Sequence, residues 1–274
     1  MNISLFFKAP TNQLTSGGSQ NNSAIQSFSD VLMLILVLLI LVAFIVIMIV
    51  VANFFLHGGP SMINKKPRPS DGKELTPTQK FILAASSVTL GREYKCLIDI
   101  WGTRNSEKGK QRAKELYEWG WGRLTADNAR TAAEECMNSG YNKRFLIYTG
   151  AVQPSEGDKT DFSDFQKLLL DEMREKYPEQ GMLAWDLVRT LSIVGGAYMG
   201  GAMEYENAAE LALEACRRLQ QSFSSWDDVA ENYTLGYQYW RGRLSTDRLK
   251  YYKKLSKTWV YDIPWDTPLK EEEL

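Results

Sequence analysis

Residues 184–201 read AWDLVRTLSIVGGAYMGG. Most of them belong to a helix that the sequence predicts over 183–199. Ser192, Gly196 and Gly200 recur every fourth residue, so they share one face of that helix. Each glycine inside a helix costs about 1 kcal/mol relative to alanine. We therefore expect a close approach at this face, either by a neighbouring helix or by the backbone of a ligand or partner.

Two charged side chains, Asp186 and Arg189, lie one turn apart in the same helix. An exposed pair at this spacing contributes roughly a few tenths of a kcal/mol. The alternative is a carboxylate and a guanidinium that are buried or line a cleft, and the spacing leaves both open. The helix is not a membrane span, because fewer than about 15 uncharged residues separate Arg189 from Glu204 and a span needs about 20.

Downstream, residues 224–242 read SSWDDVAENYTLGYQYWRG. Ser225, with Asp228 three residues later, resembles a capping box at the start of a helix over 226–241. Large apolar and aromatic residues then recur at helical spacing: Trp226, Val229, Ala230, Tyr233, Tyr237 and Trp240. Such a stripe is typical of a buried face, and an aromatic groove for a partner is the alternative. Gly236 again indicates close packing.

The remainder of the chain beyond residue 75 predicts an all-α domain over 76–274, long enough for one sizeable core. Capping residues, glycines and prolines set the helix limits. Further helices are expected over 76–101, 106–119, 125–139, 162–177, 204–222 and 246–258. The stretch 141–150, YNKRFLIYTG, alternates like a strand but has no partner strand, so we predict a loop. The C-terminal tail is expected to pack Trp265 on the domain and to leave its acidic end in solvent.

Upstream, residues 31–52 read VLMLILVLLILVAFIVIMIVVA, without a charge, glycine or proline. As a helix that rises about 1.5 Å per residue, this run covers roughly 33 Å, enough for a hydrocarbon core of about 30 Å. It lacks the basic leader and the small-residue cleavage site of a signal peptide. We predict a transmembrane helix over 31–56, after a disordered polar tail over 1–30 and before a flexible basic linker over 57–75.

Four basic residues follow the apolar run: Lys65, Lys66, Arg68 and Lys73. Lysine and arginine resist translocation, so the N-terminus is expected outside and the C-terminal domain in the cytoplasm. The cysteines agree with a reducing compartment, because Cys96, Cys136 and Cys216 are odd in number and lie in helical patterns. We expect them to be small core residues rather than reactive thiols.

Composition excludes several classes of function. The 32 Lys+Arg against 33 Asp+Glu exclude a generally basic nucleic-acid-binding protein. The single histidine, His57, removes the commonest general base and metal ligand from most of the chain. Neither a nucleotide-binding glycine motif nor zinc-ligand spacing is present. We therefore expect no metal and no cofactor and assign no catalytic residue, although catalysis by carboxylates alone remains open.

The two segments quoted above also carry a family resemblance. Its residues are Trp185-Asp186-x-x-Arg189, Gly200-Gly201 with Glu204 and Ala208, Ser225-Trp226, and Tyr233-x-x-Gly236 leading to Trp240-x-Gly242. Together with ELYEWGWGRLTADNA over 115–129, this pattern resembles the bacterial family called domain of unknown function 1266, the YbeU-like proteins, over about 110–260. The resemblance implies a compact all-α cytoplasmic domain and transfers no activity. Gly195-Gly196 departs from the family pattern, where larger or charged residues are expected.

Six residues are the candidates for a binding site: Trp185, Asp186, Arg189, Glu204, Trp226 and Tyr233. Four of them, Asp186, Arg189, Trp226 and Tyr233, are expected either to border one cleft or to form a packed polar cluster. The leading hypothesis is a cytoplasmic interaction or regulatory module, tethered to a bacterial inner membrane and bound to a protein partner. One alternative is a membrane-associated hydrolase that uses Asp186 and Arg189. A further alternative, by analogy alone, is a component of a toxin–immunity or envelope-stress system.

Overall fold

The computed structural model describes residue 33 and residues 35–48, 74–94 and 107–274 of the 274-residue chain. Its contacts divide the chain into two units, Met1–Gly59 and Pro60–Leu274. Every regular element within the described residues is helical, and none of these residues forms a strand. The prediction of an all-α protein is therefore confirmed for this part of the chain.

In the first unit, residues 33 and 35–48 are α-helical and their side chains are exposed. These residues form the middle of the apolar run over 31–52. The two ends of that run, the predicted tail over 1–30 and nearly all of the predicted linker over 57–75 lie outside the described residues. Among the helices that the structure does describe, none combines the length and the apolar character needed to cross a bilayer.

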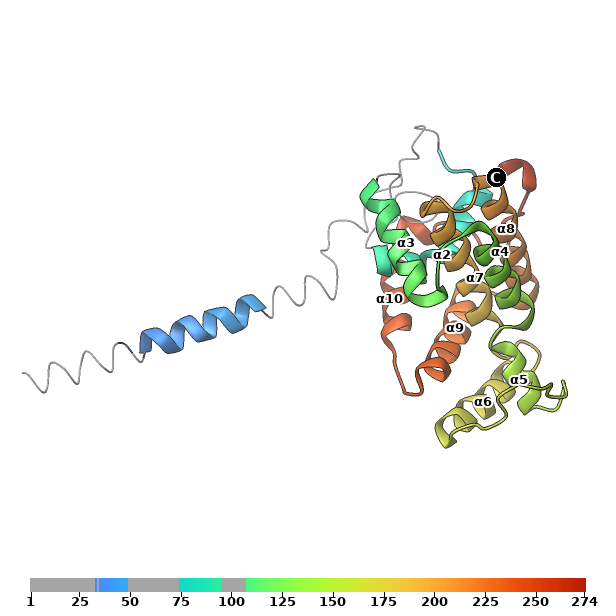
Figure 1. The fold of residues 1–274 in the computed structure, drawn as a ribbon, viewed down its shortest axis with the longest axis horizontal. Coiled ribbons are helices and arrows are strands. Elements are labelled where there is room, and N and C mark those ends of the chain that lie inside the picture. The colour runs from blue at the N-terminus through green and yellow to red at the C-terminus, as the bar shows by residue number, and fades with distance from the viewer. Residues whose placement is uncertain (1–32, 34, 49–73, 95–106) are drawn as a thin grey trace, which may run out of the picture. The chain divides into compact units, whose positions relative to one another are not determined.

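The second unit is built from nine α-helices and two short 3-10 helices within the described residues (Figure 1). The α-helices are α2 (Pro77–Tyr94), α3 (Glu107–Trp121), α4 (Ala126–Ser139), α5 (Asn142–Tyr148), α6 (Asp164–Lys176), α7 (Leu183–Met199), α8 (Tyr205–Ser222), α9 (Trp226–Arg241) and α10 (Asp247–Leu255). The 3-10 helices are η1 (Trp259–Tyr261) and η2 (Glu271–Glu273).

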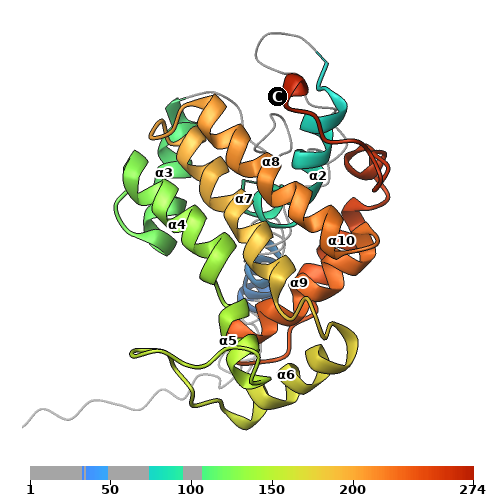
Figure 2. The ribbon, with the colours of Figure 1, turned by 90° about the vertical axis from the view of Figure 1, so that its right-hand side faces the viewer.

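Helix α7 is the centre of the second unit. It contacts α2, α3, α4, α8 and α9, and Figure 2 shows it between α4 and α8. Its apolar side chains, from Ala184 to Met199, are almost all buried. At its C-terminal end, a Cβ on Gly200 would collide with the side chain of Leu124 and lie 3.6 Å from the Cα atom of Lys114 in α3. At Gly200, the close approach expected at this face is therefore made by Leu124, between α3 and α4, with α3 beside it.

The predicted loop over 141–150 is wrong, because Asn142–Tyr148 form helix α5. No side chain of the N-cap residue, Tyr141, satisfies the first N–H groups of this helix. They donate instead to the carboxylate of Asp186, at 2.9 Å from the Tyr141 nitrogen and 2.7 Å from the Asn142 nitrogen. A cap supplied by a residue far away in the sequence leaves no local signal, which explains the error.

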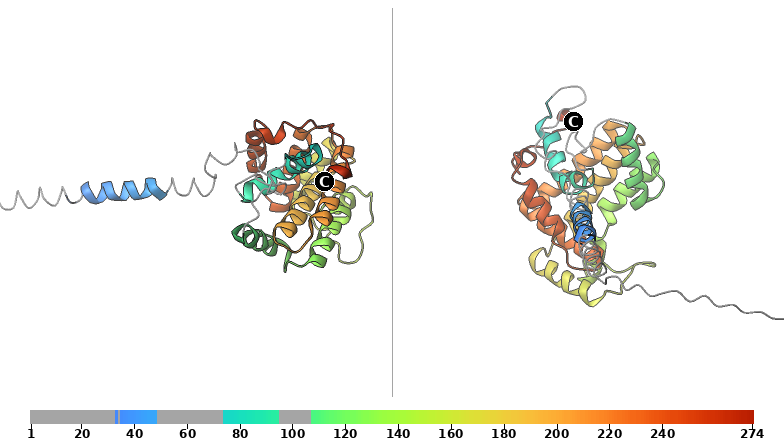
Figure 3. Two further views of the ribbon diagram at one scale, coloured as in Figure 1. Left: turned by 90° about the horizontal axis from the view of Figure 1, so that it is seen from above. Right: turned by 90° about the vertical axis from the view of Figure 1, so that its left-hand side faces the viewer.

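The C-terminal tail lies beside α2, as the red and cyan segments in Figure 3 show. Trp265 packs on Phe81 and Trp226, with ring centroids 5.5 and 4.8 Å apart, as predicted. The acidic end is not left entirely in solvent. The carboxylate of Glu273 accepts hydrogen bonds from the backbone N–H and the hydroxyl of Thr78, at 3.1 and 2.8 Å. This contact ties the chain end to the first turn of α2.

Candidate functional site

The six candidate residues do not meet in one place. Trp185, Asp186 and Arg189 of α7 lie together, and the Tyr233 ring of α9 lies 5.1 Å from the Trp185 ring. Trp226, at the N-terminal end of α9, belongs to a second aromatic cluster, and Trp226 and Tyr233 line the same small cavity. Glu204 is exposed, and it precedes α8 without making a side-chain cap. The candidates therefore form two clusters, with Tyr233 in contact with both, and one exposed residue, Glu204.

Asp186 is almost completely buried, with 1% of its surface exposed. Both carboxylate oxygens accept backbone N–H groups at the start of α5, and the Arg189 Nη1 atom lies 3.7 Å from Oδ1. Burial raises the pKa of Asp186 to about 6, against the opposing effect of the two N–H donors and of Arg189. A Cβ on Gly140 would collide with this carboxylate, so the backbone of Gly140 covers it closely.

The guanidinium of Arg189 is surrounded by three aromatic rings. Its central carbon lies 4.5 Å from the Trp121 ring centroid, 5.2 Å from that of Tyr141 and 5.1 Å from that of Trp185. Stacking of this kind holds the planar group in place by cation–π attraction. The side chain of Arg189 keeps 18% of its surface exposed, unlike that of Asp186.

Trp185 and Tyr233 connect α7 to α9 by packing. A Cβ on Gly236 would collide with the Trp185 side chain, which confirms the close approach expected at this glycine. The hydroxyl of Tyr233 lies 3.2 Å from the hydroxyl of Thr89 in α2. Both aromatic residues are buried, at 5% and 2% exposure. They hold helices together and do not border an open cleft.

Arg189 faces a groove of about 550 Å³ between the end of α3, α4, α5 and the loop after α5. We call this the Arg189 groove. It is lined by Trp121, Ala132, Glu135, Cys136, Ser139, Gly140, Tyr141, Lys143, Arg144, Gly157, Asp158, Lys159 and Arg189. Four of these residues are cationic and two are acidic. The carboxylate of Asp186 lies beneath Gly140 and is not part of the lining.

Arg144 is a site residue that the sequence analysis missed. Its guanidinium lies 5.4 Å from the Phe162 ring centroid and 5.5 Å from that of Tyr239. Its Nε atom is buried and has no hydrogen-bond partner. The residue was overlooked because it lies in the stretch that we had predicted as a loop. Correct assignment of α5 would have placed Lys143 and Arg144 beside the end of α4.

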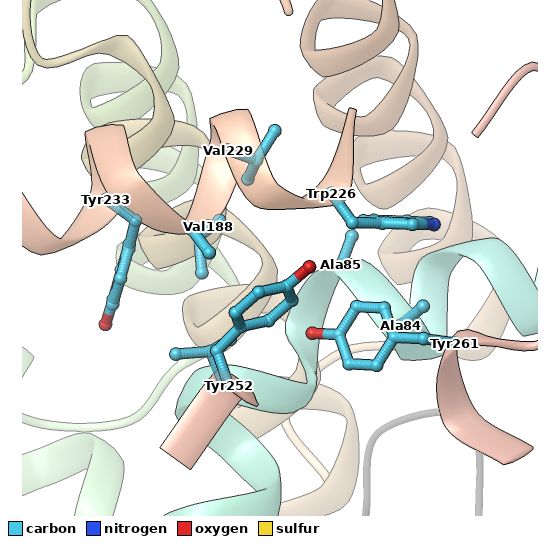
Figure 4. Close-up of a pocket in the computed structure, with 10 residues that line it drawn as sticks. Ala84, Ala85, Val188, Trp226, Val229, Tyr233, Tyr252 and Tyr261 are labelled. Atoms are coloured by element: carbon cyan, nitrogen blue, oxygen red, sulfur yellow. The ribbon is translucent and has the colours of Figure 1, made fainter. Parts of the chain in front are cut away.

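The second cluster contains Trp226 and lies beside a small cavity, where Figure 4 shows Trp226, Tyr252 and Tyr261. We call it the Trp226 cluster, and it comprises Phe81, Trp226, Tyr252, Tyr261 and Trp265. The cavity beside it holds about 10 Å³, at most the space of one water molecule. Its polar atoms are paired: the indole N–H of Trp226 donates to the Ile263 carbonyl at 3.1 Å and the Tyr252 hydroxyl donates to Asp227 at 2.7 Å.

The cysteines within the described residues are buried and free, as predicted for Cys136 and Cys216, whereas Cys96 lies outside these residues. Burial raises the pKa of the Cys136 thiol to about 12, so this thiol is protonated although its residue lines the groove. Where the structure describes side chains, no group of three or more His, Cys, Asp and Glu residues is arranged to hold a metal ion.

Comparison with known proteins gives one match. A family described as "Protein of unknown function (DUF1266)" matches residues 97–262. This stretch covers more than half of the chain and contains α3 to α10, the Arg189 groove and most of the Trp226 cluster. No curated protein and no solved structure matches the chain.

Proposed function

Since the chain belongs to the DUF1266 family of proteins of unknown function, we propose, from its own geometry, that it is an interaction module that binds a protein partner through the Arg189 groove. The observation that supports this function is a groove of about 550 Å³ with a guanidinium fixed in its wall by three aromatic rings. A rigid arginine among aromatic side chains is typical of residues that dominate binding at interfaces.

The geometry is unfavourable for the alternative of a hydrolase. A general acid or base must reach the proton that it transfers. Asp186 is 1% exposed, and its two oxygens are engaged by the backbone N–H groups of Tyr141 and Asn142. Its role is to fix the start of α5 and to hold Arg189 from below. The groove therefore offers a fixed cation but no accessible carboxylate partner from α7.

The apolar run over 31–52 supports a second part of the proposal, a single-pass tether. The basic residues after it favour a cytoplasmic location for the helical domain, with the N-terminus outside. We propose the inner membrane of a bacterium as the location. Membrane attachment would restrict the module to partners at or near the bilayer. An active C-terminal alkaline phosphatase fusion would contradict this orientation, because the enzyme is active only outside the cytoplasm.

The interaction is tested by site-specific photo-crosslinking in cells with the full-length chain. A photoreactive residue replaces Ser139 at the rim of the groove or, as a control, Glu214 on the exposed face of α8. We expect a discrete crosslinked protein from position 139, absent from position 214 and lost when Arg189→Gln is added. Equal crosslinking from both positions, or turnover by the purified chain that Asp186→Asn abolishes without unfolding it, would contradict the proposed function.

A further inference from the structure

We propose that the Arg189 groove is an oxyanion site, in which a phosphoryl or carboxylate group of the ligand is bound by the guanidinium groups of Arg189 and Arg144. The inference rests on the proposed function, because it names the chemistry by which that groove holds its ligand. It depends on the hydrogen-bonding state of the two arginines and on the charges around them.

Arg189 has donors that its own chain does not use. The structure gives its guanidinium an ion pair at 3.7 Å with Asp186 and three ring contacts, but no hydrogen bond to any described residue. The carboxylate oxygens of Asp186 each accept a backbone N–H, at 2.9 and 2.7 Å, whereas the Arg189 Nη1 atom lies 3.7 Å away. A guanidinium carries five N–H donors in a planar fork. Those of Arg189 remain accessible from the groove.

Arg144, on the α5 side of the groove, also has a guanidinium donor without a hydrogen-bond partner. Phe162 and Tyr239 fix its guanidinium by ring contacts, and its buried Nε atom has no partner. No described carboxylate forms an ion pair with it. Buried polar atoms without a partner are rare in native proteins, and each of them calls for an explanation. Both arginines line the same groove and are held by aromatic rings, and a guanidinium is suited to bind an oxyanion.

The acidic groups at the groove do not neutralise this pair. Asp158 forms an ion pair with Lys143 at 2.8 Å and accepts hydrogen bonds from Ser155, which lower its pKa to about 2. Asp186 lies below Gly140 and is engaged by α5. Glu135 is exposed at the rim and is the remaining carboxylate in the lining. Lys159, also exposed in the lining, adds a cation that forms no ion pair with a described residue.

The size of the groove fits a ligand larger than the oxyanion itself. Small-molecule sites occupy about 300–1,000 Å³, and the groove holds about 550 Å³. A free phosphorylated compound and an acidic side chain of a partner protein present the same oxygen atoms to the two arginines. The observations thus identify the charged group of the ligand, and the experiment below distinguishes its two sources.

The test is isothermal titration calorimetry of the purified full-length chain in a non-ionic detergent. The probes are sodium pyrophosphate, a peptide of ten glutamates and the same peptide with glutamine throughout. We expect one pyrophosphate or one glutamate peptide to bind per chain and the glutamine peptide not to bind. Binding of pyrophosphate alone would keep the oxyanion site but contradict a protein partner as its ligand, and tighter binding of the peptide would support a protein segment.

Variants locate the binding. Arg189→Gln and Arg144→Gln should each weaken it about tenfold or more, as expected when a charge-assisted hydrogen bond is lost. Arg189→Lys should recover part of it, because charge is kept and the planar fork is lost. Glu135→Gln should tighten the binding of the anionic probes, because it removes a negative charge from the lining of the groove. The matched control is Arg112→Gln, an exposed arginine of α3 that pairs with Glu115 outside the groove. Thermal unfolding of each variant verifies its fold.

Two outcomes would overturn the inference: no binding of any anionic probe, or equal weakening by Arg112→Gln and Arg144→Gln. If Arg189→Gln does not fold, Arg144→Gln still decides whether the groove binds the anion. Failure of this inference is distinct from failure of the proposed function. A partner that crosslinks at position 139 while no anion binds would leave the interaction module in place and remove the oxyanion.

Discussion

The Trp226 cluster and the Arg189 groove are built from similar residues but differ in how their polar atoms are satisfied. In the Trp226 cluster, indole and hydroxyl groups reach carbonyls or side chains, such as Trp265 to the Phe223 carbonyl at 3.2 Å and Tyr261 to Ser87 at 2.7 Å. Next to the groove, the Nε atom of Arg144, the indole N–H of Trp185 and the hydroxyl of Tyr239 are buried without partners.

We interpret this difference as that between a structural core and the binding surface proposed above. A packed cluster that satisfies its hydrogen bonds gains nothing from a ligand, and its cavity of about 10 Å³ excludes one. In the groove, fixed cations and donors without partners raise the free energy of the folded chain. A ligand that accepts their hydrogen bonds can offset this increase. Unsatisfied polar atoms therefore distinguish the two regions better than residue type does.

The largest expected effect is on stability, at the Trp226 cluster. Trp226→Ala should lower the free energy of unfolding by about 3–5 kcal/mol, because it removes a ring that contacts Phe81, Tyr261 and Trp265. Trp121→Ala should cost less, because that ring, half-buried like the Trp226 ring, packs on the Arg189 guanidinium at the edge of the groove. Urea unfolding followed by circular dichroism measures both. Equal losses would abolish the distinction between core and binding surface.

A single methyl group tests how tightly the floor of the groove is built. Gly140→Ala should lower the free energy of unfolding by about 2 kcal/mol, because its Cβ would overlap the Asp186 carboxylate. Gly140 is the C-cap residue of α4, with φ of −54° and ψ of −149°. Gly120→Ala in α3 is the control, since no atom lies within 4 Å of its Cβ.

For the control we expect a stabilisation of about 1 kcal/mol, the usual gain from alanine over glycine in a helix. The same denaturation experiment gives both values. A Gly140→Ala protein as stable as the unmodified chain would show that the Asp186 carboxylate can move away from residue 140. The backbone of residue 140 would then not pack closely on this carboxylate.

Acidification should stabilise the chain relative to its Asp186→Asn variant. Burial raises the pKa of Asp186 to about 6 from an ordinary value of 3.8, so the folded state binds a proton more tightly than the unfolded state. Stability contributed by this group therefore increases as the pH falls through 6 and decreases as the pH rises. From pH 7.5 to pH 5 the gain should be about 1 kcal/mol.

Asparagine at position 186 does not titrate, so the difference between the two proteins isolates this group from all others. Urea unfolding at several pH values measures the difference. A difference independent of pH would mean that the carboxylate keeps an ordinary pKa, and that the backbone donors and Arg189 compensate for burial completely.

Much of the fold could be predicted from the sequence, and the errors have a common physical origin. Glycine spacing at Gly200 and Gly236 correctly predicted close packing, because a missing side chain is a local feature with a steric consequence. The helix start marked by Ser225 was correct, because this cap acts within one turn. Helix α5 was missed because Asp186, 44 residues from Asn142, provides its cap.

The site was harder to predict than the fold for the same reason. Asp186 and Arg189 were identified as a pair, but spacing could not tell that one is sealed and the other faces a groove. Trp226 and Glu204 were grouped with them through the family resemblance, and the structure places both elsewhere. Arg144 depends on two rings, Phe162 and Tyr239, that are distant in the sequence and brought together only by folding.

The smallest effect on stability is expected at Lys159, and it separates binding from folding most clearly. Lys159 is exposed in the loop after α5, so Lys159→Gln should change the free energy of unfolding by less than about 0.5 kcal/mol. If the groove binds an oxyanion, the lost charge should still weaken pyrophosphate binding severalfold, and more so at low salt. Lys250→Gln on α10, equally exposed but outside the groove, should change neither quantity. A Lys159→Gln protein that binds pyrophosphate as tightly as the unmodified chain would confine recognition to the two aromatically held arginines, because the loop would then contribute no charge to the site.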